Sequence, residues 1–170
     1  IGKVERTLNY KADQALHVVN GVAGEEKKYE DKINATLVTS RTNIGAEKQP
    51  CVDTFGVATY RYGYDNRGNL IYTIYLDLAG NRVDSKDGFA EICWEYDTRD
   101  NVTRGLFFGV DGKPVFHKNH GVAEYRWEYD TRGNMMRVLY FGVDGKPVLH
   151  KDGFAEVRKE YDAHGNMRRE

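Results

Sequence analysis

One short pattern returns four times along this chain and constrains its fold more than any other feature. A tyrosine followed by an aspartate leads into a turn at Tyr64–Asp65, Tyr96–Asp97, Tyr129–Asp130 and Tyr161–Asp162, and successive tyrosines are 32, 33 and 32 residues apart. A regular period of this length indicates a repeat array, in which each repeat packs mainly against its neighbours. We therefore expect one supersecondary unit to recur along the chain.

The segments around each Tyr-Asp pair also match. The lead-ins read "GVATYRYGYD", "GFAEICWEYD", "GVAEYRWEYD" and "GFAEVRKEYD", and a block such as "FGVDGKPV" recurs between them. The chain begins and ends inside a repeat, so we expect it to be a piece of a longer, bacterial protein. We predict a single β-repeat domain over 1–170, with repeats at 1–20 (partial), 21–55 (divergent), 56–87, 88–120, 121–152 and 153–170 (partial).

The lead-in alternates between apolar and polar residues. Ala123, Tyr125, Trp127 and Tyr129 are separated by charged side chains, and this period of two predicts a strand with one apolar face. The following Asp-x-x-Gly-Asn favours a tight turn, because aspartate bonds to the backbone two residues on and glycine adopts the left-handed conformation. Each repeat is thus expected to contain a β-hairpin.

The turn also predicts a register for the hairpin, fixed by Asp130 facing Asn134. Two copies depart from the pattern. Asp100 replaces the turn glycine and tolerates the left-handed region, whereas Ile33 does not, which predicts a remodelled hairpin around 29–35. The register gives these cross-strand pairs: Tyr129–Met135, Trp127–Arg137, Tyr125–Leu139, Ala123–Phe141 and Trp94–Arg104.

A third strand is expected after each hairpin. "VDGK" indicates another turn, and "PVLHKD" or "PVFHKNH" then indicates a short strand that leads into the next repeat. The predicted fold class is all-β, an antiparallel meander with about three strands in each repeat of 32–33 residues. We expect the sheet to stay open, and its unpaired edges would allow self-association.

The Tyr-Asp-x-x-Gly-Asn core over residues 56–170 resembles the YD repeats of bacterial RHS-type proteins, whose strands wind into large shells. The hairpin in each repeat is also similar to the MORN and WG-type repeat arrays, which build elongated sheets and serve mostly as scaffolds. The "GKPV" to "DGFAE" part of the repeat has no place in the YD motif. The resemblance implies a scaffold or shell architecture and carries over no catalytic residue.

Composition excludes some partners. Charged residues make up 30% of the chain but leave a net charge of -1, which argues against a nucleic-acid surface. No apolar run is long enough for a membrane span, so no membrane insertion is expected. The two cysteines, Cys51 and Cys93, lie in different repeats and are predicted to remain thiols. They leave both a cytoplasmic and a secreted location open.

Neither histidines nor aspartates indicate catalysis or a cofactor. His117 and His150 share a repeat position without convergent metal ligands, and we interpret them as repeated surface or edge histidines. The aspartate column is explained by turn initiation. We therefore predict no enzymatic activity, no metal and no cofactor.

The remaining candidates are aromatic. In the predicted register Tyr75, Phe107 and Tyr140 share a column on the face opposite the core, either covering charged stems or forming a ladder of contacts for a partner. The preferred function is a non-enzymatic binding or scaffold module within a larger protein, recognising a protein or other domains of its own polypeptide. The alternatives are a shell segment of an RHS-like secreted toxin and a glycan-binding array on this ladder.

Overall fold

A computed structural model describes residues 3–8, 22–32 and 35–169. The chain divides into two compact units, and the boundary between them in the sequence lies between Lys86 and Asp87. This boundary falls within one residue of the predicted junction between the repeats 56–87 and 88–120. Five described strands belong to the N-terminal unit: β1 (Val4–Leu8), β2 (Gly24–Lys32), β3 (Ala35–Ile44), β4 (Thr59–Tyr64) and β5 (Leu70–Leu76).

The C-terminal unit carries the better-preserved repeats. Two full hairpins are followed by a shorter and more irregular copy. Its described strands are β6 (Glu91–Tyr96), β7 (Val102–Phe108), β8 (Glu124–Tyr129), β9 (Met135–Phe141), β10 (Glu156–Arg158), β11 (Glu160–Tyr161) and β12 (Met167–Arg169).

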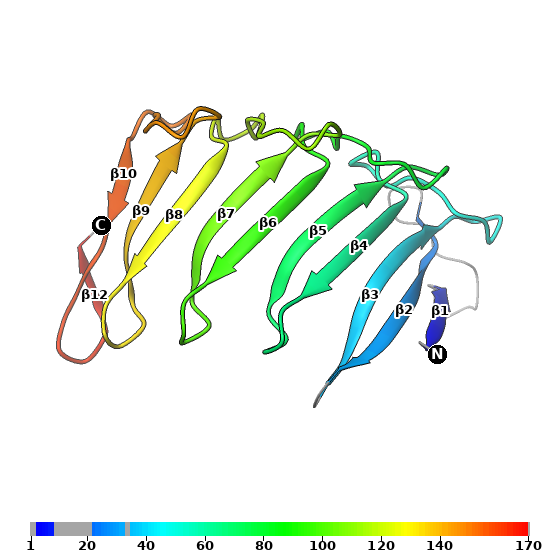
Figure 1. The fold of residues 1–170 in the computed structure, drawn as a ribbon, viewed down its shortest axis with the longest axis horizontal. Coiled ribbons are helices and arrows are strands. Elements are labelled where there is room, and N and C mark those ends of the chain that lie inside the picture. Colours follow the sequence, from blue (N-terminus) through cyan, green and yellow to red (C-terminus); the bar gives the residue numbers. More distant parts are fainter. Residues whose placement is uncertain (1–2, 9–21, 33–34, 170) are drawn as a thin grey trace, which may run out of the picture. The chain divides into compact units, whose positions relative to one another are not determined.

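The predicted fold class is confirmed: the fold is all-β, and within each unit the neighbouring strands of a sheet pair antiparallel. Within the N-terminal unit β1 to β5 follow one another in chain order, as do β6 to β10 within the C-terminal unit (Figure 1), and neither meander closes into a barrel. β11 and β12 form a separate two-stranded ladder. The described residues contain no helix, and hence none long and apolar enough to cross a membrane.

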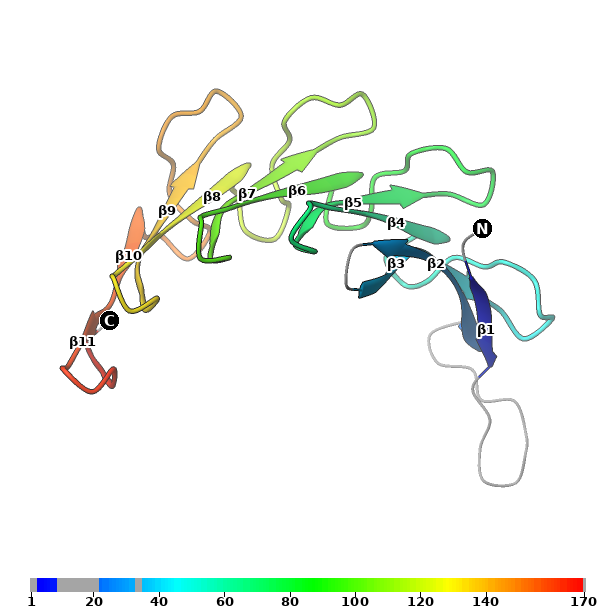
Figure 2. The same ribbon diagram turned by 60° about the horizontal axis from the view of Figure 1, so that its bottom comes forward.

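The third strand expected in each repeat does not form in the described residues. The segments 45–58, 109–123 and 142–155, which we call the return loops, instead carry turns and isolated bridges such as Phe108 with Pro114 and Phe141 with Pro147. Figure 2 shows the two return loops of the C-terminal unit rising on the same side of its strands. Proline, which has no N–H with which to extend a ladder, stands at the bridge of each of these three loops, but the bridge of Leu76 with Arg82 also stays isolated without one.

The hairpin register agrees with the prediction only next to the turn. The Asp130 N–H donates to the carbonyl of Asn134 at 3.0 Å, and Tyr129 pairs with Met135. A β-bulge then shifts the pairing between Glu128 and Tyr129. The same shift follows at Gly63/Tyr64, Glu95/Tyr96 and Lys28/Tyr29, and it recurs in the last hairpin at Glu160/Tyr161.

The bulge makes the predicted long-range pairs wrong. One extra residue in the second strand turns every later side chain to the other face of the sheet. The observed pairs are Trp127–Val138, Tyr125–Tyr140, Glu128–Arg137, Glu124–Phe141, Trp94–Gly105 and Glu95–Arg104.

The two exceptional turns have different outcomes. Asp100 adopts a φ of 63°, so aspartate takes the left-handed conformation that glycine adopts in the sister turns. Ile33, the other exception, lies outside the described residues. β2 and β3 nevertheless pair as a hairpin, from Gly24 with Ile44 to Lys32 with Ala35.

The corrected register gives the sheet of the C-terminal unit two distinct faces. The aromatic face carries Trp94, Phe107, Tyr125, Trp127 and Tyr140. The charged face carries the glutamates and arginines that alternate with them. The buried core lies on the aromatic face and beneath the return loops, where Phe89, Ala90, Phe107, Val122, Ala123 and Tyr140 are each at most 5% exposed.

The charged face is held by a repeated ion-pair ladder. Arg104 donates to Glu95 of its own hairpin at 2.7 Å and to Glu124 of the next hairpin at 2.8 Å. Arg137, one repeat later, pairs with Glu128 at 3.5 Å and with Glu156 at 2.5 Å. Arg104 and Arg137 therefore connect successive hairpins, instead of stacking on tryptophans as the predicted register required.

Candidate functional site: an aromatic and histidine cluster

The repeated turn aspartates are engaged with their own turns. In Asp130 one carboxylate oxygen accepts the N–H groups of Arg132 at 2.8 Å and Asn134 at 2.9 Å, and the other accepts the Asn134 side-chain amide at 2.9 Å. Asp65, Asp97 and Asp162 make the same three bonds. The Asn134 amide bond, together with these backbone bonds, lowers the pKa of Asp130 against the opposing effect of burial.

Replacing Asp130 with alanine is expected to lower the melting temperature of the C-terminal unit by roughly 4–8 °C. The change leaves two N–H groups and one amide without their acceptor. Asp144→Ala is the matched control, because the Asp144 carboxylate accepts one N–H of its turn, that of Lys146, and pairs with the exposed Lys146 ammonium at 3.3 Å. Since the pKa of Asp130 is lowered on folding, its contribution is present above the unfolded pKa of about 3.9 and is lost as the pH falls below it. Equal melting temperatures for the two variants would contradict this role.

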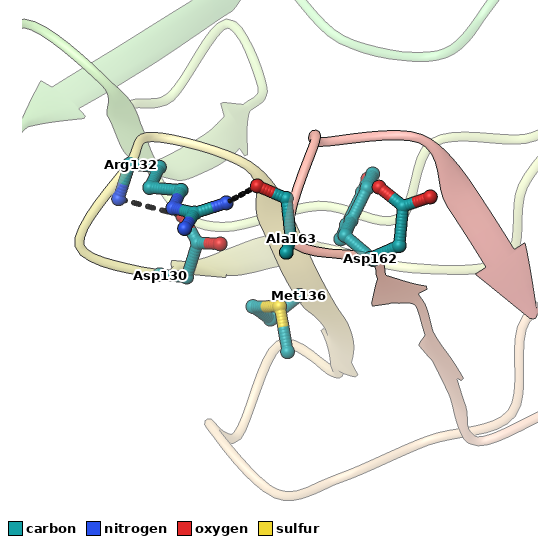
Figure 3. Close-up of a pocket in the computed structure, with 6 residues that line it drawn as sticks. Asp130, Arg132, Met136, Asp162 and Ala163 are labelled. Atoms are coloured by element: carbon teal, nitrogen blue, oxygen red, sulfur yellow. Dashed lines mark hydrogen bonds between the residues drawn. The ribbon is translucent and has the colours of Figure 1, made fainter.

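A hollow lies between the last two hairpin turns and is lined partly by their aspartates. It has a volume of about 270 Å³ and is bordered by Asp130, Arg132, Met136 and Asp162 (Figure 3). The Arg132 guanidinium reaches across it to the carbonyl of Ala163. Arg99 reaches the next turn in the same way, donating to the carbonyls of Thr131 at 2.7 Å and Asp130 at 3.0 Å. The arginines thus link neighbouring turns.

The tyrosines of the Tyr-Asp pairs also link hairpins. The Tyr161 hydroxyl donates to the backbone carbonyl of Met135 at 3.0 Å, and the Tyr64 hydroxyl donates to that of Val38 at 2.9 Å. Burial raises the pKa of the phenols of Tyr64 and Tyr129. The Tyr-Asp motif therefore acts in packing and in turn formation.

A continuous aromatic cluster lies where the return loops cover the aromatic face. Phe107 contacts the rings of Phe89, His117 and Tyr125 at centroid distances of 4.7, 5.1 and 6.0 Å. Tyr125 continues the cluster to Tyr140 at 5.5 Å and to Trp127 at 5.4 Å. Tyr140 in turn contacts the ring of His150 at 5.2 Å, so the cluster joins both return loops of the C-terminal unit to the sheet.

The cluster contains two of the three residues expected to form an outward-facing ladder. Phe107 and Tyr140 are each 5% exposed, so their predicted exposure to a partner is wrong. In the N-terminal unit Tyr75 pairs with Tyr60 and packs edge-on against its ring at 5.1 Å. The bulge is the cause, because it places this column on the core face.

The histidines are also placed differently from the expectation. His117 is 8% exposed and buried in the cluster, not on a surface or an edge strand. Its Nδ1 accepts the backbone N–H of Asn119 at 3.2 Å, and the Nδ1 of His150 accepts that of Asp152 at 3.3 Å. In the N-terminal unit Asp53 holds the same position after the bridge and accepts the N–H of Phe55 at 2.9 Å. Imidazole and carboxylate therefore cap the same repeated turn.

His120 is a residue that the sequence reasoning left without a role. Its ring stacks on that of His117 at 3.9 Å and lies 5.4 Å from that of His150. Its Nδ1 lies 2.6 Å from the hydroxyl of Tyr125. Burial raises the pKa of Tyr125 to about 12, so the phenol keeps its proton at neutral pH and bonds to His120 as donor or acceptor, according to the tautomer of the imidazole. This pair holds the loop on the sheet.

Beyond the return loops the aromatic face continues as a partly exposed row, which we call the indole row: Trp94, Gly105 and Trp127. The two indole rings lie 6.2 Å apart, and both lean over Gly105. A Cβ at Gly105 would lie 2.8 Å from Trp94 Cζ3 and 3.1 Å from Trp127 Cη2. The glycine therefore lets aromatic side chains from two successive repeats meet.

Groups that could bind a metal do not converge in the part of the chain that the structure describes. Both cysteines are present as thiols without a disulfide between them. Burial raises the pKa of Cys51, and Cys93 lies on the charged face, where its Sγ is 3.4 Å from a carboxylate oxygen of Glu91.

Comparisons with known proteins give no family for this chain. No protein-family model matches it, and no curated protein matches it at a significant level.

Proposed function

We propose that the chain is a non-enzymatic repeat module that binds a protein partner, or another domain of its own polypeptide, through the indole row. The observation that carries the proposal is the meeting of Trp94 and Trp127 over Gly105, where both indoles stay partly exposed. Tryptophan is enriched among the residues that dominate binding energy at protein interfaces. Two successive hairpins, β6–β7 and β8–β9, each supply one such side chain.

The polar side chains of the repeat support a structural role for the rest of the unit. The turn aspartates cap turns, the arginines connect hairpins or turns, and His117 caps a return loop. Each of these groups is engaged in bonds that hold the repeat together. The indole row is therefore the repeated feature that we assign to recognition.

A test begins with proteins captured from lysate on the immobilised chain. The most enriched protein is identified, purified and titrated against the chain, with fluorescence as the readout. Both tryptophans of the chain lie in the indole row, so quenching or a spectral shift reports this surface directly. Trp94→Phe and Trp127→Phe are each expected to weaken binding by a few-fold to about tenfold, and the double variant further.

The matched control lies on the opposite face of the same strands. Glu128→Gln changes an exposed side chain of the charged face, 54% exposed in its ion pair, and is expected to leave the affinity unchanged. A folded double tryptophan variant that binds the purified partner as tightly as the parent chain would sink the proposal. A loss of affinity in Glu128→Gln alone would assign recognition to the charged face.

Glycan binding is a second candidate function, favoured by the two adjacent indole rings. Titration with a neutral tetrasaccharide such as cellotetraose, followed by the same fluorescence, tests it. Saturable binding that both tryptophan variants weaken would replace the protein-partner proposal. A shell segment of an RHS-like toxin stays an alternative at the level of sequence resemblance.

A further inference from the structure

We propose that the return loop 109–123 is an acid-released cover over the aromatic cluster, with His117 and His120 as the groups that respond to pH. This device is independent of the proposed function. It rests on three observations: the hydrogen bond that the His117 imidazole accepts, the close stacking of His117 and His120, and the contrast between His117 and the matched positions elsewhere in the chain.

The first observation is that the His117 imidazole is bonded as an acceptor. Its Nδ1 accepts the Asn119 N–H at 3.2 Å, and the His120 Nδ1 lies 2.6 Å from the Tyr125 hydroxyl. An imidazolium has no free lone pair, because both of its nitrogens carry protons. Protonation of His117 therefore removes the acceptor that holds the Asn119 N–H.

The second observation is the stack. The His117 and His120 ring centroids lie 3.9 Å apart with an interplanar angle of 7°, so two positive charges would meet face to face. Burial, and then the neighbouring imidazole of His120, lowers the pKa of His117, and burial followed by His150 lowers that of His120. Asp87 opposes the shift at both rings without overcoming it.

The titratable groups that face the two rings come from several elements of the C-terminal unit. The neighbours are Asp87 before β6, Lys118 in the same loop, Tyr125 on β8, Tyr140 on β9, and His150, Lys151 and Asp152 in the return loop 142–155.

The third observation is a matched pair of loops. His150 caps its turn as His117 does, but a carboxylate oxygen of Asp152 lies 3.2 Å from its Nδ1, ready to accept a proton from the charged ring. His117 has Asn119 at that place, which offers no charge. The loop 109–123 also belongs to the one 33-residue repeat, and its extra residue brings His120 into the stack.

The sign of the effect follows from the lowered pKa values. In the opened loop an imidazole has the ordinary pKa of about 6.5, whereas in the closed loop its pKa is lower. Closure is therefore fully favoured above pH 6.5 and weakens as the pH falls toward the pKa of the imidazoles in the closed loop. At pH 5.5 each histidine that stays neutral in the closed loop shifts the opening equilibrium by up to about tenfold. The turn aspartates, such as Asp130, have lowered pKa values and titrate below this window.

Amide hydrogen exchange measured by NMR at pH 7.5, 6.5 and 5.5 tests the device on the whole chain, with protection factors corrected for intrinsic exchange. The probes are Asn119 and Gly121, whose N–H groups bond to His117. Their protection is expected to fall about tenfold or more between pH 7.5 and 5.5. The internal reference is the Phe55 N–H, held by the Asp53 carboxylate, which is expected to change little.

Two variants decide the cause. Asn119→Asp places a carboxylate beside His117, as Asp152 stands beside His150, and is expected to reduce the response severalfold. His117→Asp copies the cap of the N-terminal unit and is expected to remove it. His164→Gln, an exposed histidine in a hairpin turn, is the control and keeps the full response. Equal pH dependence at Asn119 and Phe55, or an undiminished response in both loop variants, would overturn the proposal.

Discussion

Replacing Phe107 with alanine is expected to lower the free energy of unfolding of the C-terminal unit by about 3–5 kcal/mol, the range for a buried phenylalanine. Phe107 is 5% exposed and contacts Phe89, His117 and Tyr125. Truncation removes these contacts and leaves a cavity between the sheet and the return loop. Urea unfolding followed by tryptophan fluorescence measures the change, because both tryptophans of the chain lie in this unit.

Phe116→Ala is the matched control for this prediction. Phe116 lies in the same return loop but is 44% exposed, so its truncation is expected to change stability by no more than about 0.5–1 kcal/mol. If Phe107→Ala left the unfolding curve unchanged and instead weakened partner binding, the outward-facing ladder would be right. The core described above would then be wrong.

The local features of the fold were predictable because short-range chemistry encodes them. The period of 32–33 residues, the hairpins and the Asp-x-x-Gly-Asn turns follow from side chains within a few residues of one another. Asp130 and Asn134 bond as expected. Asp100 supports a left-handed turn in place of glycine.

The bulge was not predictable, because nothing in the sequence marks the extra residue. It is Thr39, Ile71, Thr103 or Met136 in successive hairpins, and these side chains share no turn chemistry. Both faces of the second strand carry large apolar residues, so a slip by one leaves an equally plausible pattern. A register without the bulge therefore placed Phe107 and Tyr140 on the surface in the prediction and paired the tryptophans with the wrong residues.

One signal in the sequence pointed to the correct register. Gly105 stands in the middle of a strand, where glycine is unfavourable unless another group approaches closely. The observed pairing places Gly105 opposite Trp94 and beside Tyr125, and the indoles fill the space of its missing side chain. The histidine cluster had a weaker signal, the single additional residue of the repeat 88–120.

The second large effect is expected for Trp127→Ala, which we predict to lower the free energy of unfolding by about 2–4 kcal/mol. The upper part of the range for tryptophan truncation applies to full burial, and Trp127 is only partly buried. Its ring stacks on Tyr125 at 5.4 Å and meets Trp94 at 6.2 Å. The loss therefore comes from contacts on both sides of the indole.

Double-mutant cycles show which neighbours carry that energy. In the observed register Trp127 couples to Tyr125 on its own strand, by about 0.5–1.5 kcal/mol beyond area burial for an aromatic pair. It does not couple to Arg137, which lies on the charged face with Glu128 and Glu156. The cycles combine Trp127→Ala with Tyr125→Leu and, separately, with Arg137→Ala, and use urea unfolding followed by circular dichroism. A coupling energy to Arg137 that exceeds the one to Tyr125 would restore the register without a bulge, and with it the exposed aromatic ladder.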